Sequence, residues 1–402
     1  MCDLYLFKTE ENHKVDIIKL KMENDRENPQ GGVVREIKNP FFAVKKYSDF
    51  DKPSPKYGKP VEMGSYSLDI NKKFIDSDVG LRYYIQPPNL QKVYFDLNHG
   101  FETRHIKERG RDINILYWIK GHMGTEEASE SRLDADFVTQ RGLLTKLMLT
   151  PYVENENEGW YIAVTLFNGT YYLNEVESDE KKERERKTVD DIESCRGWKF
   201  EQYLTADTSN GKPNTDIPYN NCEGFYKVVK SKLKNHSLVF SGEIDAVKVD
   251  EVKGNSYVEF KTTKEIRMGQ RYLRNFQRYK TKHWWVQSYL TGTKEIVCGF
   301  KDKNGIVNRV HTFKRADMLI IAKDAREPWK PNVCFNYLDL FLSTVKSKIT
   351  HDDYRIVYTL KWNPHKPVMI SPPLRDSEFN FLPEWYVAWK QTAEGARVHV
   401  SP

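Results

Sequence analysis

The chain has 402 residues, which is long enough for one large domain or two ordinary domains with a sizeable buried core. No apolar run approaches the roughly 20 residues of a membrane-spanning helix. Five cysteines without CxxC spacing indicate neither a disulfide framework nor a cysteine zinc site. The net charge of +6 suits a polyanionic partner, although many proteins without such a partner are equally basic.

Residues 1–60 mix charges with Asn, Pro and Gly and show little periodicity, which predicts an irregular N-terminal arm. One domain is expected over residues 61–402. The first residues, MCDLYLFKTEENHK, lack the basic start and the long apolar stretch of a secretory signal. An intracellular protein is therefore expected, with the nucleus favoured over the cytoplasm and no membrane as partner.

The first clear element is a predicted helix over residues 135–149, ADFVTQRGLLTKLML. Its apolar residues, beginning with Phe137 and Val138, recur at helical spacing, and Pro151 then ends the element. The following segment predicts two strands around Asn168-Gly169, because Asn-Gly is the strongest short signal for a hairpin.

The later elements alternate irregularly between strands and helices. The sequence predicts strands at residues 239–249, 256–263, 295–302 and 354–362, and helices at 280–292, 331–349 and 381–390. Gly292 ends the first of these helices, and Asn304-Gly305 predicts a second hairpin. The charged run at residues 179–187 predicts a solvated loop or helix face, with nuclear import as the less favoured alternative. Without repeats or long linkers, this order predicts one mixed α/β (α+β) domain with a sheet core.

Four side chains that can carry chemistry lie on two of the predicted strands. Residues two apart in a strand face the same side, so Glu243 and Asp245 share one face. Glu259 and Lys261 share another face, and the hairpin register places Asp245 nearly opposite Phe260 and within reach of Glu259. Clustered carboxylates repel one another, a cost that is tolerable where Mg²⁺ or Mn²⁺ binds between them. One or two such ions would activate water against a phosphodiester.

The same pattern also describes exposed charges in cross-strand pairs, each worth roughly a few tenths of a kcal/mol. The neighbouring residues favour the functional interpretation. Ile244 and Phe260 set the acids in apolar strands, where unpaired charge is costly. A helix bearing Gln287 follows at the distance where nucleases of the D-(D/E)xK type place a glutamine.

Five short motifs follow one another along the chain. They are TQRGLLTKLMLTPY with Arg141, GWKFE ending in Glu201, GEID with Glu243 and Asp245, EFK with Glu259 and Lys261, and QSYLTG beginning with Gln287. In this order they resemble the active-site motifs of the DXO/RAI family of RNA 5′-end processing enzymes. The similarity covers roughly residues 60–315, and Tyr289 stands where some relatives carry Phe.

The resemblance implies two β-sheets flanked by helices and a D-(D/E)xK nuclease-like core, in a catalytic domain over residues 61–402. It implies metal binding by side chains, by one backbone carbonyl and through water. The implied ligands are Glu201, Asp245 and Glu259 through their side chains, Phe260 through its carbonyl and Glu243 through water. Glu243, Lys261 and Gln287 would be catalytic, the last two by positioning water and phosphate, and Arg141 would contact the substrate.

The activity implied by the resemblance belongs to RNA quality control. Relatives remove incomplete, unmethylated or NAD caps, release pyrophosphate from triphosphate ends, or degrade RNA from 5′ to 3′. The implied cofactor is one or two Mg²⁺ or Mn²⁺ ions. The implied partners are a single-stranded RNA 5′ end and a large 5′–3′ exoribonuclease.

Two other functions stay open at this point. One is a DNA nuclease of the D-(D/E)xK type, and the other is a catalytically weak relative that binds and stabilises a partner exonuclease. Lys146 and the basic residues 267–274 could contact phosphates, or they could form a solvated helix face. Trp284 and Trp285 are expected in the core rather than stacked on a base. The ten histidines show no metal-ligand pattern, and none is given a role.

Overall fold

The computed structural model describes residues 39–398, except residues 45, 109, 111, 124–132 and 157. The expectations for residues 1–38, which make up most of the predicted arm, lie outside the described residues. The remainder of that arm joins the fold: residues 39–42 form the edge strand of a sheet, and Phe41 and Phe50 are buried in the main core.

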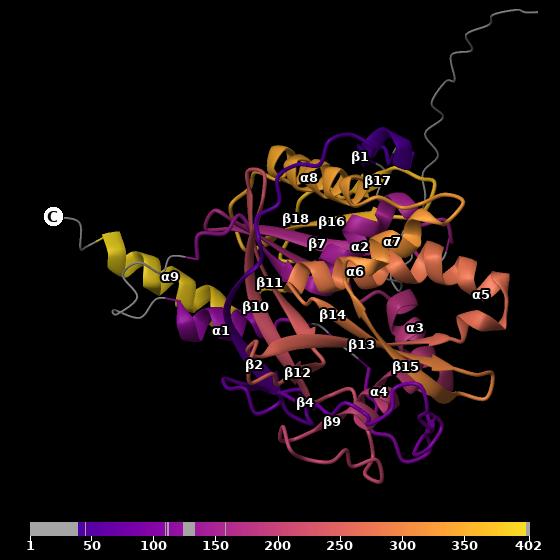
Figure 1. Ribbon diagram of the computed structural model, residues 1–402. Helices are drawn as coiled ribbons and strands as arrows, with labels where there is room; N and C mark the ends of the chain where they lie inside the picture. The colour runs from indigo at the N-terminus through magenta and orange to yellow at the C-terminus, as the bar shows by residue number, and fades with distance from the viewer. Residues whose placement is uncertain are drawn as a thin grey trace, which may run out of the picture. The chain divides into compact units, whose positions relative to one another are not determined.

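Within the described part of the chain, eleven strands form one large mixed sheet (Figure 1). Their order is β1-β17-β16-β7-β8-β6-β11-β10-β2-β3, with β18 paired to β16. The strands are β1 (Asn39–Phe42), β2 (Val61–Leu68), β3 (Phe74–Ile75), β6 (Phe137–Gln140), β7 (Trp160–Phe167), β8 (Thr170–Glu175), β10 (Gly224–Leu233), β11 (His236–Ile244), β16 (Ile356–Trp362), β17 (Val368–Ile370) and β18 (Leu374–Arg375).

A second sheet of seven strands follows the order β5-β15-β14-β13-β12-β4-β9. Its strands are β4 (Tyr83–Tyr84), β5 (Phe95–Asp96), β9 (Thr205–Ala206), β12 (Ala246–Lys248), β13 (Ser256–Lys264), β14 (Glu295–Lys301) and β15 (Ile306–Lys314). β13 pairs with β14 in parallel and with β12 antiparallel, so it lies inside the sheet. The expected mixed fold with two sheets is confirmed.

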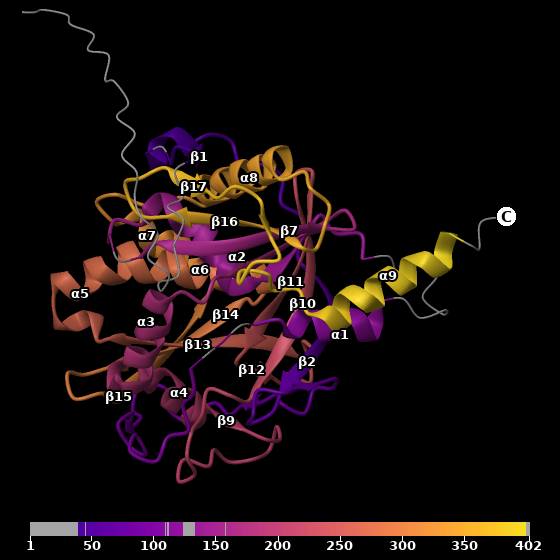
Figure 2. The ribbon, with the colours of Figure 1, turned by 180° about the vertical axis from the view of Figure 1, so that it is seen from behind.

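Helices cover the faces of both sheets (Figures 1 and 2). They are α1 (Asn114–His122), α2 (Arg141–Leu149), α3 (Asp179–Asp190), α4 (Ile192–Leu204), α5 (Gln270–Asn275), α6 (Thr281–Thr291), α7 (Asp317–Lys323), α8 (Pro331–Lys348) and α9 (Glu384–Val398). Short 3₁₀ segments occur at Tyr47–Phe50, Thr150–Tyr152 and Ile266–Met268, and a π-helical segment spans Phe276–Lys280. None of the helices among the described residues has the length and apolar character to cross a membrane.

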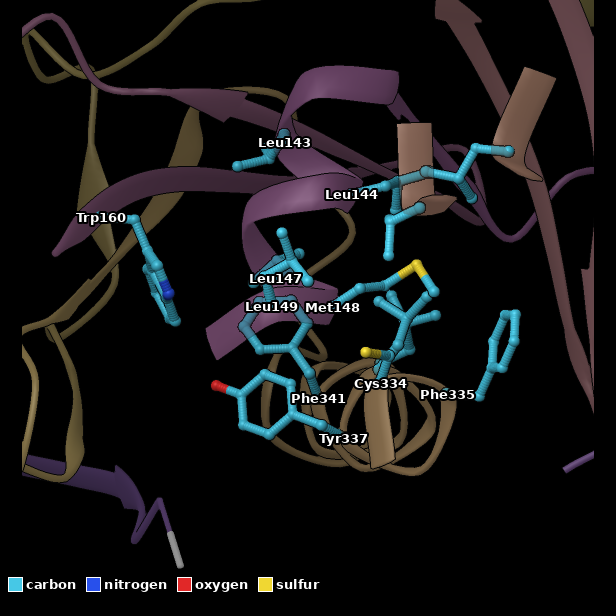
Figure 3. Packing of buried hydrophobic residues seen from close by; sticks show 14 of the residues in the cluster. Leu143, Leu144, Leu147, Met148, Leu149, Trp160, Cys334, Phe335, Tyr337 and Phe341 are labelled. Carbon is cyan, nitrogen blue, oxygen red and sulfur yellow. The ribbon is translucent and has the colours of Figure 1, made fainter. Parts of the chain in front are cut away.

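Because successive side chains of a strand point to opposite faces of the sheet, one strand can contribute to two hydrophobic cores. In β11, Leu238 and Phe240 join the main core with α2, α6, α7 and α8, whereas Val239 packs on the other face with α1 and α9. In β14, Ile296 joins the main core, and Val297 faces α4. Figure 3 shows the leucines of α2 meeting the aromatic side chains of α8 inside the main core. Because both faces are covered, these strands form nearly continuous apolar runs in the sequence.

Most predicted elements are confirmed. The hairpin at Asn168-Gly169 joins β7 to β8, and α6 ends at Gly292 in the left-handed conformation with φ of +78°. The charged run lies on α3, which has no buried residue. The predicted helix over 135–149 is wrong at its start, because Phe137 and Val138 belong to β6 and pair in parallel with β11. Their β-forming side chains fit a strand buried on both faces, and the helix begins at Arg141.

A second prediction is also wrong. Residues 239–249 do not form one strand, because β11 ends at Ile244 and β12 starts at Ala246. β11 belongs to the large sheet and β12 to the small one. The chain therefore passes from one sheet to the other at Asp245.

The turn glycines of the small sheet provide a test of packing. Gly305, in the β14–β15 turn, has φ of +85°, and an added Cβ would lie 2.5 Å from the guanidinium carbon of Arg196. Arg196 is held there, since its Nη2 donates to Oδ1 of Asn98 at 2.7 Å. Gly305→Ala should therefore lower the free energy of unfolding by ~3 kcal/mol, of which about 1 is backbone strain. Urea denaturation measures this loss.

The matched control is Gly254→Ala in the β12–β13 turn. Gly254 has φ of +79°, but nothing lies within 4 Å of an added Cβ. It should lose only the strain contribution of about 1 kcal/mol. Equal losses in the two variants would show that contact with Arg196 does not fix the turn.

Candidate active site

The junction between the two sheets gathers the residues that the motifs single out. Asp245 stands between the last residue of β11 and the first residue of β12. Its Oδ2 accepts a hydrogen bond from the backbone N–H of Phe260 at 2.6 Å. The β12–β13 register pairs Ala246 with Val258, so Asp245 lies across from Glu259, one residue from the expected position opposite Phe260. The predicted approach of Asp245 to β13 is therefore confirmed.

Glu259 is the most deeply buried acid of this group, with only 1% of its surface exposed. Nζ of Lys261 donates to Oε1 at 2.6 Å, and Nη1 of Arg141 donates to Oε2 at 3.2 Å. Burial alone would raise the pKa of Glu259, but Lys261 and Arg141 hold it below its usual value. Both oxygens of this carboxylate are thus neutralised by cations.

Arg141 reaches Glu259 from the first turn of α2, across β11. Its Nη1 also donates to the backbone carbonyl of Glu243 at 2.9 Å. Gly242 permits this path, because a Cβ at that position would lie 3.0 Å from Cβ and Cδ of Arg141. The glycine of the GEID motif therefore has a packing reason as well as a place beside the acids.

Glu201 comes to the site from α4. The preceding residue, Phe200, is fully buried and packs over Gly299 of β14, where a Cβ would approach the ring to 2.5 Å. Burial, followed by repulsion from Asp245 and Glu243, raises the pKa of Glu201 well above its usual value. Burial and repulsion from Glu259 raise the pKa of Asp245 to about 7. Burial and mutual repulsion therefore make the charged forms of Glu201 and Asp245 unfavourable in the folded protein.

Two further polar groups of the site lack partners within the described residues. The side chain of Glu243 makes no hydrogen bond or ion pair there, although its backbone carbonyl does. Oε1 of Gln287, on α6, is buried and without a partner. The neighbouring Trp284 and Trp285 are buried at 3% and 5% exposure, which confirms the expectation that they belong to the core.

A basic group near the site was not expected from the sequence. His283 lies one turn before Gln287 on α6, and burial together with the positive charges of Lys261 and Arg141 lowers its pKa. Burial and neighbouring lysines, Lys261 among them, also lower the pKa of Lys280. Helical spacing from Gln287 is the signal that could have found both residues. Lys146 does not join this group, because it forms an ion pair with Glu175.

The donor set suits a hard divalent cation, since carboxylate and carbonyl oxygens are the ligands that such ions prefer. A divalent cation would offset the repulsion between Glu201 and Asp245, and a water molecule would give the unpartnered oxygen of Gln287 a donor. Among the described side chains, however, no three acidic, histidine or cysteine groups already stand in a ligand arrangement. A cation would have to compete with Lys261 and Arg141 for Glu259.

Comparison with known proteins decides the family. Residues 58–387 match the family model described as RAI1 like PD-(D/E)XK nuclease. The chain belongs to this nuclease family. A decapping and exoribonuclease protein of Xenopus laevis is 36% identical over 350 residues, which cover 83% of this chain and 86% of the relative. The resemblance seen in the motifs is confirmed, and with it the assignment to a family of hydrolases whose relatives are decapping nucleases and exoribonucleases.

Solved structures support the fold. Rai1 of Candida albicans in complex with pU5-Mn2+ superimposes with a TM-score of 0.73 at 22% identity, covering 84% of this chain and 98% of that one. Rai1 of Scheffersomyces stipitis in complex with (3'-NADP)+ and calcium ion gives a TM-score of 0.72 at 21% identity, with the same coverage. The nuclease-like fold with two sheets is therefore shared.

The raised pKa of Asp245 leads to a test of stability. A carboxyl whose pKa is higher in the folded state favours folding when protonated, so the metal-free protein should lose stability as pH rises from 3.8 towards 7. Asp245→Asn cannot ionise and still offers an acceptor to the N–H of Phe260. In EDTA at pH 8 this variant should melt at a higher temperature than the wild type, and the difference should vanish near pH 4. If the wild type is the more stable of the two at pH 8, the ionised carboxylate of Asp245 does not destabilise the folded protein, and the prediction is wrong.

Proposed function

We propose that the protein is a metal-dependent hydrolase of RNA 5′ ends that acts in RNA quality control. Its substrates are RNAs with incomplete, unmethylated or NAD caps, and it also releases pyrophosphate from triphosphate ends and degrades RNA from 5′ to 3′. The observation that carries the proposal is the meeting of Glu201, Asp245 and Glu259 with Lys261 and Arg141 at the junction of two sheets. Relatives with 36% identity bear the name decapping and exoribonuclease protein, which supports this substrate class.

The metal ligands of the proposal are the three clustered carboxylates of Glu201, Asp245 and Glu259, with the backbone carbonyl of Phe260 and with Glu243 through water. The ion is Mg²⁺ or Mn²⁺, one or two in number, and the Mn2+ complex of the Candida relative supports this choice. When bound, such an ion polarises the phosphoryl oxygens and lowers the pKa of a bound water.

The chain's own residues then orient the reactants. Lys261 and Gln287 position the attacking water and the scissile phosphate, because the ammonium favours negative charge and the amide oxygen of Gln287 is still without a partner. Glu243, whose carboxylate makes no bond with the described residues, accepts the proton of the water. Arg141 contacts a phosphate of the substrate.

At a triphosphate end, water attacks the α phosphorus, pyrophosphate leaves, and the RNA keeps a 5′ monophosphate. At a capped end, the reaction is a hydrolysis after the first nucleotide. Water forms a bond to phosphorus, and the bond between phosphorus and the 3′ oxygen of the first nucleotide breaks. The products are a cap dinucleotide with a free 3′ hydroxyl and an RNA that begins with a 5′ monophosphate. No redox partner or second substrate is needed.

We also propose a protein partner and a place of action. A large 5′–3′ exoribonuclease is proposed as a partner, and the nucleus is favoured over the cytoplasm as the place of action. The complete acid set supports catalysis over a purely binding relative.

The first test uses end-labelled RNAs of one sequence with five different 5′ ends. These are a monophosphate, a triphosphate, an unmethylated cap, a methylated cap and an NAD cap, each incubated with Mg²⁺ or Mn²⁺. The wild type should cleave at least one of them. Asp245→Ala and Glu259→Ala should lower the rate by at least about 10³-fold, because each removes a proposed metal ligand.

The matched control is Glu251→Ala, which removes an exposed carboxylate from the β12–β13 turn. It should keep the wild-type rate. Circular dichroism must show that all variants are folded. Full activity in folded Asp245→Ala would refute the site assignment.

A second test separates RNA from DNA as the substrate. 5′-phosphorylated RNA and DNA of one sequence are compared at equal concentration, and kcat/KM should be larger for RNA by about tenfold or more, because a 2′-hydroxyl distinguishes the two strands. A clear preference for DNA would favour the DNA nuclease that the sequence left open.

A further inference from the structure

One continuous run of helix leads into the site. α5, the π-helical segment and α6 follow one another without a break from Gln270 to Thr291, and α5 lies at its outer end (Figure 1). Lys280, His283 and Gln287 are separated by three and four residues, so they share one face of this helix. At ~1.5 Å rise per residue, His283 and Lys280 lie about 6 and 10 Å from Gln287 along the axis.

Both side chains reach solvent, but the protein around them displaces much of their water. Burial, together with Lys261 and Lys280, lowers the pKa of His283 to about 4, so its imidazole is neutral near pH 7. Burial, together with Lys301 and Lys261, also lowers the pKa of Lys280. Arg141 repels a charge on His283 as well, and Glu259 is the acid that opposes these cations there.

Neither side chain is satisfied inside the protein. Lys280 and His283 make no hydrogen bond or ion pair with the described residues, and Lys301 is already bound to Glu193. A partly desolvated ammonium that other lysines repel gains most from a bound anion. The nearby acids cannot fill this need, since both oxygens of Glu259 are held by Lys261 and Arg141.

The position of Lys280 and His283 relative to the scissile phosphate indicates which anion they bind. In the proposed reaction the scissile phosphate lies at Lys261 and Gln287, and its 5′ side is limited to the first nucleotide with its 5′ phosphates or cap. The strand on the 3′ side continues, and each further nucleotide brings another phosphate. A row of groups that leads from Gln287 towards the outer end of the helix matches a strand that continues beyond the scissile phosphate, and only the 3′ strand does so in every proposed substrate.

We propose that Lys280 and His283 bind the backbone of the nucleotides directly 3′ of the scissile bond, Lys280 through an ion pair with a phosphate and His283 through a hydrogen bond. The inference rests on the proposed function and adds to it a preference for substrate length. A substrate with several nucleotides beyond the scissile bond contacts the whole row, whereas a dinucleotide contacts only its beginning. Affinity should therefore rise with RNA length over the first few nucleotides.

The experiment measures binding without cleavage. Fluorescence anisotropy in EDTA follows 3′-labelled, 5′-phosphorylated RNAs of two and ten nucleotides. For the longer RNA, Lys280→Ala should bind about tenfold more weakly, and His283→Ala about threefold more weakly. The slope of log Kd against log salt should fall by about 0.7 in Lys280→Ala, as expected for one lost phosphate contact on a single strand. Lys280→Arg should restore both the affinity and the slope.

Two kinds of control accompany these variants. Lys323→Ala removes an exposed lysine from α7 and should bind like the wild type. Arg271→Ala and Arg274→Ala remove exposed cations from α5 that do not share the face of Gln287, and they should lose less than Lys280→Ala does. Wild-type binding by both Lys280→Ala and His283→Ala, or equal losses in the Arg271 and Arg274 variants, would overturn the proposal.

The failure of the proposed function would look different. If the wild type binds the longer RNA through Lys280 in EDTA but cleaves no RNA with Mg²⁺ or Mn²⁺, the hydrolase proposal fails and the binding row stands. If the wild type cleaves RNA and its affinity does not depend on length or on Lys280, the row is refuted and the hydrolase proposal stands.

Discussion

The site depends on the neutralisation of one buried carboxylate. Glu259 is 1% exposed, and a charge at that depth is tolerated only because Lys261 and Arg141 each bond one of its oxygens. Lys261 comes from the same strand, whereas Arg141 comes from α2 and also bonds the carbonyl of Glu243 in the large sheet. The ion pairs therefore tie the two sheets together at the point where the chain passes between them. Loss of either cation would leave one oxygen of this buried carboxylate without its counter-charge, and loss of Arg141 would also loosen the junction.

Around Glu259 the site also contains acidic and basic groups whose charged forms are unfavourable in the folded protein. Burial, followed by repulsion from neighbouring acids, raises the pKa of Glu201 and of Asp245, and burial together with neighbouring lysines lowers the pKa of Lys280. Each of these groups lowers the stability of the folded protein when it is charged. A fold selected for stability alone would give each charge a partner of opposite sign. A divalent cation would offset the charge of the two acids, and a phosphate backbone would offset that of Lys280. The proposed metal ion and the proposed RNA substrate would therefore both stabilise the folded protein.

The sequence predicted which residues meet at the junction of the sheets better than it predicted the path of the chain. Strand spacing identified Glu243, Asp245, Glu259 and Lys261, because period-two spacing is a local property. Glu201 and Gln287 were identified by the resemblance to the family's motifs. The change of sheet at Asp245 could not be identified, because the run VFSGEIDAVKV has the same apolar pattern whether it feeds one sheet or two. Phe137 and Val138 were assigned to a helix since their spacing also fits period 3.6, and only the parallel pairing with β11 decides for a strand. Helical spacing places Lys280 and His283 on the face of Gln287, but their proposed roles also depend on the direction of α6, which the sequence does not give.

The position of Asp245 explains why a carboxylate occurs at the change of sheet. β12 is only three residues long, and its ladder with β13 begins at the Ala246–Val258 pair. Beyond that pair, the N–H of Phe260 would lack an acceptor on this side, and Oδ2 of Asp245 supplies one at 2.6 Å. Oδ1 makes no bond with the described residues and is left for the site. One side chain therefore continues the hydrogen bonding of the small sheet and offers a ligand oxygen. An apolar residue at this position could do neither.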